Sequence, residues 1–302
     1  MTQPTALAAK GQVVEEWIDL HFFRPLGFRI ARALQGTGAT PDQVTVASLL
    51  LGLAAGHLMV YRSAALNAAG VGLFIVSDIF DSADGQLARM RGTSTRFGRI
   101  LDGASDNLRF INLYVHLLVR LLLAGAGWEV VALALAAGVS HSFQSAAVDF
   151  MRQAYLYLGA GRGSELDLPE TAGRTDARTW LQRVGAFLYR DYVRRQAWLF
   201  PRTVELVRAT GAEAGEPLRA EYRDRTTARV GRCAWIGQNM RFLLLAVTAV
   251  PGWPTGFFWL TVGPLNLILL GLVLGQERAA RALLRAVVAP ARPRAPARAR
   301  IA

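Results

Sequence analysis

The sequence has one cysteine, Cys233, and very little lysine, so nearly all of its basic residues are arginine. A single cysteine excludes an intrachain disulfide and agrees with a reducing compartment. We expect no cleavable signal peptide, because the first apolar stretch comes late and follows acidic and aromatic residues. We find no internal repeat and no low-complexity run except a Pro/Ala/Arg tail at 289–300, which we expect to lack fixed structure.

Long apolar runs are abundant. Hydrophobic residues make up 52% of the 302 positions, and they collect in runs close to the ~20 residues that cross a bilayer. The formal net charge of +12 could suit nucleic acid, but that needs a soluble basic face. The apolar runs argue against a nucleic-acid partner and favour an anionic membrane surface. We expect six membrane-spanning helices, at about 41–61, 64–90, 102–124, 127–151, 233–250 and 254–275.

The arginines indicate the orientation of these spans. The connections near 62, 125 and 252 are short and contain one arginine, Arg62, whereas 89–99, 152–232 and the tail are rich in arginine. Because cytoplasmic loops carry the excess of Lys and Arg, we expect a multi-pass protein of the inner or plasma membrane. Its two termini and its active site would be cytoplasmic.

The predicted fold is all-α: a single membrane domain over 1–302, built as a six-helix bundle. Its segments are an interfacial amphipathic helix at 10–35, spans one to four with an aspartate motif at 41–151, a cytoplasmic Arg-rich helical insert at 152–232, spans five and six at 233–275, and a basic tail at 278–302. An ordinary soluble helix is the alternative for the first segment.

Two segments contain local sequence patterns that predict helices. Thr40-Pro41-Asp42-Gln43 can cap the first span, because Thr40 and Gln43 have the spacing of a capping box. Within the insert, residues 178–210 are predicted to form an amphipathic helix. Its apolar residues with the spacing of one face are Trp180, Val184, Phe187, Leu188 and Tyr192.

Four aspartates stand out in two adjacent predicted spans. Asp81 and Asp84 are three residues apart, and Asp102 and Asp106 are four apart, so each pair shares a helix face. A short break around 92–94 makes the two helices antiparallel. Counting at about 1.5 Å per residue puts both pairs at the same boundary of the membrane.

Such a cluster needs a countercharge. Two like charges 4 Å apart repel by about 4 kcal/mol at an effective dielectric near 20. Protonation would relieve the repulsion, and hard divalent cations with oxygen ligands would relieve it better. Asp78 continues the acidic face, and Arg109 could pair with a carboxylate. The alternative is a solvated helix end with surface salt bridges.

The spacing of these residues resembles the signature of the CDP-alcohol phosphotransferase (CDP-alcohol phosphatidyltransferase) family. The matching positions, in order, are Asp81, Asp84, Gly85, Ala88, Arg89, Gly98, Asp102 and Asp106. The stretch from Thr40 to Thr45 is similar to the family's Thr-Pro-Asn-x-x-Thr opening, with Asp42 in place of the usual asparagine. The insert at 152–232 is not part of the minimal family pattern.

The resemblance implies a reaction and a set of residue roles. A phosphatidyl group would pass from a CDP-linked lipid such as CDP-diacylglycerol to an alcohol, with release of CMP. Asp81, Asp84 and Asp102 would hold two Mg²⁺ or Mn²⁺ ions, and Asp106 would ligate a metal, take the proton from the acceptor hydroxyl, or do both. Gly85, Ala88 and Gly98 would line the cytidine side, and Arg89 would lie near the phosphates. Family members are commonly homodimers.

The acceptor stays open: glycerol 3-phosphate, inositol or its phosphate, and serine all fit. Arg241 could shape an acceptor pocket, and Arg152 and Arg232 could bind a phosphate on the acceptor, although topology-setting charge explains all three as well. A membrane prenyltransferase with metal-bound diphosphate is the nearest rival. The non-enzymatic rival is a transporter or scaffold whose aspartates bind an ion.

Overall fold

The structure, a computed structural model, describes residues 13–93, 96–161, 166–172, 180–211 and 214–288. All regular secondary structure in these ranges is helical, so the predicted all-α class is confirmed for them. The Pro/Ala/Arg tail at 289–300 and the side chain of Asp102 lie outside the described set.

The N-terminal segment forms a bent helix that crosses one end of the molecule. A short π-helical turn, Asp19–Phe23 (η1), continues directly into α1, Arg24–Leu34. Arg91, just after α3, donates to the carbonyl oxygens of Leu34, Gln35, Thr37 and Ala39 at 2.5–3.1 Å. This one side chain therefore fixes the connection from α1 to the next helix. Whether α1 lies on a membrane surface stays a prediction.

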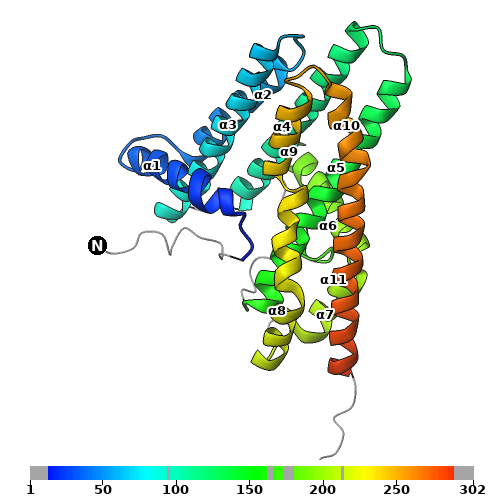
Figure 1. Cartoon of the computed structure of the whole chain (residues 1–302). Helices are drawn as coiled ribbons and strands as arrows, with labels where there is room; N and C mark the ends of the chain where they lie inside the picture. Colours follow the sequence, from blue (N-terminus) through cyan, green and yellow to red (C-terminus); the bar gives the residue numbers. More distant parts are fainter. Residues whose placement is uncertain (1–12, 94–95, 162–165, 173–179, 212–213, 289–302) are drawn as a thin grey trace, which may run out of the picture.

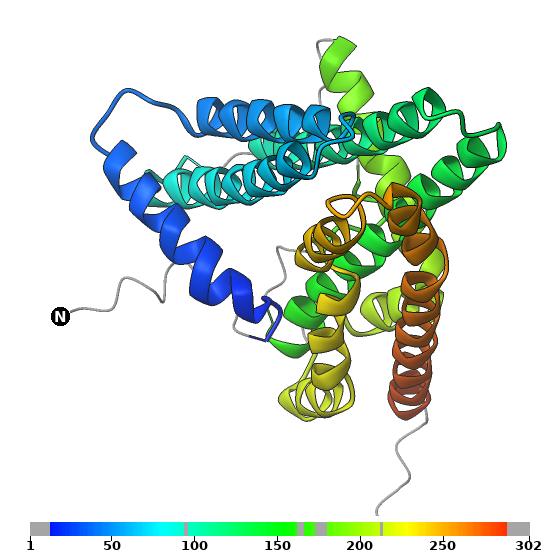
Figure 2. The ribbon, with the colours of Figure 1, turned by 45° about the horizontal axis from the view of Figure 1, so that its top comes forward.

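Three long helices follow and pack on one another. They are α2, Pro41–Leu58; α3, Ala64–Met90; and α4, Arg96–Leu123. The predicted capping box at the start of α2 is confirmed: the Gln43 amide donates to Thr40 Oγ1 at 3.3 Å, and the Thr40 amide donates to Gln43 Oε1 at 2.9 Å. Helix α2 contacts both α3 and α4, and α1 contacts α3; Figure 2 shows this group from above.

The second half of the bundle has more breaks. Its elements are α5, Glu129–Ala154; a π-helical turn, Tyr155–Gly159 (η2); a 3₁₀ turn, Arg232–Ile236 (η4); α9, Gln238–Thr248; α10, Pro254–Val262; and α11, Pro264–Val288. A local break at Gly263 and Pro264 separates α10 from α11, but the two helices together still form one apolar stretch within the last predicted span. Phe74, Leu117, Leu245 and Phe257 are buried together where the two halves meet.

Among the described residues, three helices are long and apolar enough to cross a membrane. They are Ala64–Met90, Glu129–Gly159 and Pro254–Val287. The other three expected spans have identifiable limits: α2 begins with the polar residues Asp42 and Gln43 and ends near His57, α4 carries several charges along its length, and α9 has only 11 residues. The six-span count therefore stays a prediction.

The predicted insert contains three helices. Helix α6, Trp180–Leu199, is followed directly by α7, Pro201–Thr210, and then by α8, Glu216–Gly231. The described part of the range 178–210 is helical as expected, with a break where Pro201 starts a new helix. The first turn of α7 is capped by Glu277 of α11, whose carboxylate accepts from the amides of Arg202 and Thr203 at 2.7 and 3.0 Å. In Figure 1, α7 and α8 lie below α6.

Candidate active site

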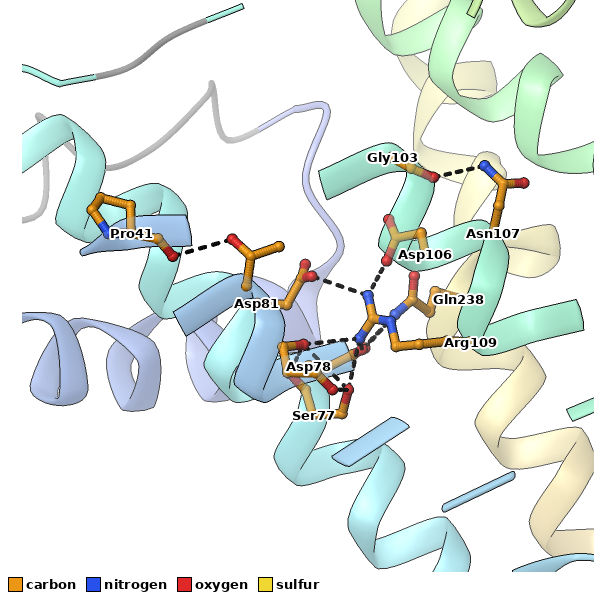
Figure 3. Close-up of polar contacts among 11 residues, drawn as sticks. Pro41, Ser77, Asp78, Asp81, Gly103, Asp106, Asn107, Arg109 and Gln238 are labelled. Atoms are coloured by element: carbon orange, nitrogen blue, oxygen red, sulfur yellow. Dashed lines mark hydrogen bonds and ion pairs between the residues drawn. The ribbon is translucent and has the colours of Figure 1, made fainter. Parts of the chain in front are cut away.

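Arg109 on α4 is the centre of the acidic cluster. Its guanidinium is 2% exposed; Nη1 donates to Asp78 Oδ1 at 3.1 Å and Nη2 to Asp81 Oδ1 at 3.0 Å. The same Nη2 pairs with Asp106, one turn earlier on α4. Figure 3 shows the guanidinium between carboxylates of α3 and α4. Side chains from two helices therefore meet at one point, and the suggested pairing of Arg109 is confirmed.

A slot in α2 makes room for this arginine. A Cβ atom at Gly52 would lie 2.3 Å from Arg109 Cδ and 2.6 Å from its Cγ, so any larger residue would collide with the arginine stem. Arg109 Nη1 also donates to Ser77 Oγ at 2.8 Å and to Ser48 Oγ at 3.3 Å. The two serines tie α2 to α3, since each hydroxyl donates to the other's carbonyl oxygen at 2.8 Å. The guanidinium is thus held rigidly.

The charges at this point do not balance. Three carboxylates against one guanidinium leave two negative charges in excess when all groups are ionised. The side chains of Asp81 and Asp106 are 25% and 38% exposed, whereas Asp78 is 12% exposed. Asp78 is further satisfied by Gln238 of α9, which donates to both of its oxygens at 2.6 Å. The excess charge therefore lies at Asp81 and Asp106, on the open side.

Asp84 is a second carboxylate whose surroundings suit a cation. It is buried, and its Oδ2 atom has no hydrogen-bond partner among the described residues. A buried carboxylate oxygen without a partner is costly, and a divalent cation with oxygen ligands would satisfy it. The carboxylate oxygens of Asp81, Asp84 and Asp106 are therefore the kind of ligand that a hard divalent cation prefers.

The four-aspartate metal site itself stays a prediction. In the ranges that the structure describes, no three or more His, Cys, Asp or Glu side chains form a group suited to a metal ion. Two features account for this: Arg109 lies between Asp81 and Asp106, and the side chain of Asp102 is outside the described set. The backbone does place Asp102 one turn before Asp106 on α4.

The residues predicted for the nucleotide lie near the same end of α3. Asp81, Gly85 and Ala88 follow each other at four and three residues and therefore share a helix face. A Cβ at Gly85 would lie 3.3 Å from Arg89 Nη1, so the glycine leaves space beside that guanidinium. Arg89 itself is exposed, and Gly98 is partly exposed near the start of α4.

The three arginines proposed for the acceptor are in different surroundings. Arg152 Nη2 donates to Glu16 Oε1 at 2.9 Å, whereas Arg241 is fully buried and donates to Gln144 Oε1 at 2.9 Å. Arg232 is exposed at the start of η4. Within the described contacts, no hydrogen bond or ion pair brings two of these arginines to a shared partner. Their role in acceptor binding stays a prediction.

Glu16 fixes the N-terminal segment to the bundle. Its carboxylate also accepts from Asn239 Nδ2 at 2.8 Å, and a Cβ at Gly237 would lie 2.2 Å from its Oε1. Asn239 donates in addition to Asp19 at 2.9 Å. Burial raises the pKa of Glu16, partly offset by its contacts with Asn239 and Arg152. This network adjoins the acidic cluster, because Asn239 directly follows Gln238, which donates to Asp78.

Sequence reasoning did not single out Ser48, Gly52 or Ser77. The only signal was that positions 48 and 52 are small and four residues apart, hence on one face of α2. Small residues at that spacing usually mean close helix packing. Their link to the acidic cluster becomes visible only when α2, α3 and α4 are assembled.

The chain is similar in sequence to known proteins over part of its length. The profile of the CDP-alcohol phosphatidyltransferase family matches residues 39–189, half of the chain. Phosphatidylinositol phosphate synthases are similar over a shorter stretch: the one from Mycobacterium marinum is 38% identical over 79 residues, 26% of this chain and 33% of its own length. That from Mycobacterium tuberculosis is 42% identical over 80 residues, 26% of this chain and 36% of its own length.

An archaeal relative is matched more extensively. Archaetidylinositol phosphate synthase from Pyrococcus horikoshii is 29% identical over 140 residues, 46% of this chain and 71% of its own length. The match covers only about a third of the mycobacterial relatives. No solved structure matches the chain significantly.

Proposed function

Because this chain belongs to the CDP-alcohol phosphatidyltransferase family, we propose that it is a membrane enzyme of phospholipid synthesis. It transfers a phosphatidyl group from a CDP-linked lipid, such as CDP-diacylglycerol, to the hydroxyl group of an alcohol and releases CMP. The observation that carries this proposal is the meeting of Asp81 and Asp106 at Arg109. It brings the acidic ends of two helices of the family motif together.

Asp81, Asp84, Asp102 and Asp106 would hold two divalent cations, Mg²⁺ or Mn²⁺. Two observations support this set: the excess negative charge around Arg109, and the buried Asp84 oxygen without a partner. When bound, such cations neutralise charge on the diphosphate and on the departing CMP.

Asp106 is the proposed general base. Its side chain is 38% exposed, so an acceptor hydroxyl can reach it, and its contact with Arg109 fixes its orientation. The hydroxyl oxygen forms a new bond to the phosphorus of the phosphatidyl group while the bond from that phosphorus to the CMP oxygen breaks. The hydroxyl proton passes to Asp106, and CMP leaves with the bridging oxygen.

The neighbouring motif residues would position the donor. Gly85, Ala88 and Gly98 leave space for the cytidine, and Arg89 provides an exposed guanidinium for the phosphates. The lipid chains of the donor would remain in the membrane beside the site.

We propose a phosphorylated acceptor, with inositol phosphate as the first candidate. The relatives found are named as phosphatidylinositol phosphate and archaetidylinositol phosphate synthases. Arg152, Arg232 and Arg241 are the proposed phosphate ligands, and Arg152 already binds one carboxylate, that of Glu16. This pairing would have to open or be shared when the acceptor binds.

The proposed enzyme has six spans, with the site and both termini on the cytoplasmic side, and it functions as a homodimer without nucleic acid. The arginine-rich connections at 89–99 and 152–232 support this orientation.

The test is CMP release by the purified protein in lipid, with CDP-diacylglycerol, Mg²⁺ or Mn²⁺, and a panel of glycerol 3-phosphate, inositol, inositol phosphate and serine. We expect CMP release that stops with a chelator and returns with the metal. Asp106→Asn should lower turnover by at least about 100-fold, in line with the loss of a general base. Asp224→Asn, an exposed carboxylate on α8, should not change it. Metal-independent turnover, or near-normal activity of Asp106→Asn, would refute the proposal.

A further inference from the structure

Helix α6 packs on the bundle through one face. Ala186, Val193 and Gln196 are buried there, at the spacing of a single helix face. Helix α6 contacts α4 and α5 of the bundle, as well as α7, which follows it in the chain. Two polar contacts fix it to α5: the Tyr192 hydroxyl donates to Asp149 at 2.5 Å, and Arg195 donates to Ser142.

The opposite face of α6 is apolar and exposed. Val184, Phe187, Leu188 and Trp198 are 46%, 63%, 54% and 73% exposed, and at 100° per residue they cluster within one third of the helix circumference. The charged residues on this face, Asp191 and Arg195, form an ion pair with each other at 2.9 Å, and the long side chain of Arg195 also extends to Ser142 of α5. The face therefore presents large apolar side chains with little net charge.

A stripe of arginines borders this face. Arg183, Arg190 and Arg194 are all exposed and lie on one edge of the apolar surface. They have the spacing of seven and four residues. A helix with an apolar face and a basic edge is suited to an anionic lipid surface, where the rings enter the acyl region and the arginines contact phosphates.

The depth of α6 agrees with such a position. Helix α5 belongs to a candidate span that starts at Glu129. Ser142 and Asp149, which contact α6, lie about 20 and 30 Å further along at 1.5 Å per residue. The hydrocarbon core of a bilayer is about 30 Å thick. If the hydrocarbon core begins at Glu129, the contacts of α6 with α5 lie at the depth of its last third, and α7 and α8 lie beyond them (Figure 1).

We propose that the apolar face of α6 is immersed in the membrane at the cytoplasmic boundary, with Arg183, Arg190 and Arg194 on the headgroups of anionic phospholipids. The surface thus has a lipid partner that the proposed transfer reaction does not require. A second copy of the chain or a soluble protein would cover the face differently, and the test separates these cases.

The experiment uses spin labels on the full chain in nanodiscs of phosphatidylcholine, alone or with phosphatidylglycerol. Labels are attached at Phe187→Cys and Leu188→Cys in a Cys233→Ala background, and at Glu221→Cys on α8 as an exposed control. The relaxation caused by oxygen, which enters lipid, is compared with that caused by a water-soluble nickel chelate. CMP release is measured separately, so that failure of the transfer reaction does not affect this readout.

We expect the labels at 187 and 188 to be several-fold more accessible to oxygen than to nickel, with the reverse at 221. Phosphatidylglycerol should increase this difference, and replacing Arg183, Arg190 and Arg194 with glutamine should remove the increase. Nickel accessibility like that of the control would overturn the proposal, because the face would be in water. Low accessibility to both reagents would also overturn it, because protein would cover the face. If phosphatidylglycerol still increased the difference between oxygen and nickel accessibility after all three arginines were replaced, the role of the arginines would be refuted.

Discussion

At the scale of single residues, Arg109 determines how the acidic cluster is held together. It is almost fully buried and compensates carboxylates of both α3 and α4. Removing one partner of a buried ion pair is expensive because the remaining charges lose their compensation. Arg109 therefore stabilises the junction at which the proposed cations bind, and we regard it as a positioning residue.

Arg109→Gln should destabilise the protein by about 3 kcal/mol, because three carboxylates then repel one another without a buried countercharge. Mn²⁺ should restore part of this loss, and it should raise the melting temperature of the variant more than that of the original protein. Thermal melting in detergent with and without Mn²⁺ measures both effects.

The matched control is Arg208→Gln, which removes an exposed ion pair with Glu170. Such pairs contribute about 0–1 kcal/mol, so its melting temperature should hardly change. If Mn²⁺ raised the melting temperatures of the two variants equally, this would argue against a metal site among the aspartates around Arg109.

A second prediction concerns the slot in α2. Gly52→Ala puts a methyl group 2.3 Å from Arg109 Cδ, so the arginine must shift away from Asp81 and Asp106. Overpacking of this kind costs about 1–3 kcal/mol, and CMP release should fall more than stability does. Melting and activity are measured on the same preparation.

Gly72→Ala is the control. Gly72 also lies inside a long helix, α3, but a Cβ atom at this position meets nothing within 4 Å. Alanine in a helix interior is favoured over glycine by about 0.5–1 kcal/mol, so this variant should be as stable or more stable, and fully active. If both variants kept full activity, Arg109 would not need its present position.

The sequence predicted the residues of the motif but not their support. Asp81, Asp84 and Asp106 could be placed by spacing alone, because three and four residues along a helix mean one face. Ser48, Gly52 and Ser77 could not, since their importance depends on how three helices pack. The sequence also could not predict that Arg109 pairs with three carboxylates, because these partners come from two different helices.

At the scale of elements, the N-terminal segment is anchored by a buried carboxylate. Glu16 bonds to Arg152 of α5 and Asn239 of α9, which ties the start of the chain to two distant helices. Because burial raises its pKa above the usual 4.5, its contribution to stability is fully present below that value. The contribution is lost as the pH rises through the raised pKa of the folded protein.

Glu16→Gln should remove this pH dependence while its amide keeps a hydrogen bond to the segment. The melting temperature of the variant, relative to that of the original protein, should therefore rise as the pH increases from about 4.5 through the raised pKa. Glu221→Gln, in an exposed pair with Arg225, is the control and should show no such trend. If the melting temperatures of Glu16→Gln and the original protein changed equally with pH across this range, Glu16 would not be the source of the pH dependence.

Helix boundaries were predicted best where the signal is local. The cap at Thr40 and Gln43 needs four consecutive residues only, and it was correct. The sequence indicated helical structure over 178–210 but did not give the start of α7 at Pro201. Its stabilising partner, Glu277, is 74 residues away from Thr203 in the sequence, so no local pattern could reveal it.

At the scale of the whole molecule, the chain combines apolar helices with a charged site at one end of them. The all-helical fold and three apolar helices of sufficient length follow from the long hydrophobic runs. The number of spans is harder to predict, because α4 must carry the motif's charges and α9 is short. The same helices that weaken the membrane signal are those that contribute polar groups to the site.

The account depends most on cation binding between α3 and α4. The direct measurement is the amount of Mn²⁺ bound by the purified full chain, determined by electron paramagnetic resonance. Asp81→Asn, Asp84→Asn and Asp106→Asn are compared with the original protein and with Asp224→Asn. We predict that the original protein and Asp224→Asn bind the same amount of Mn²⁺, and that each of the three motif variants loses most of it. Equal binding by all five proteins would contradict the account.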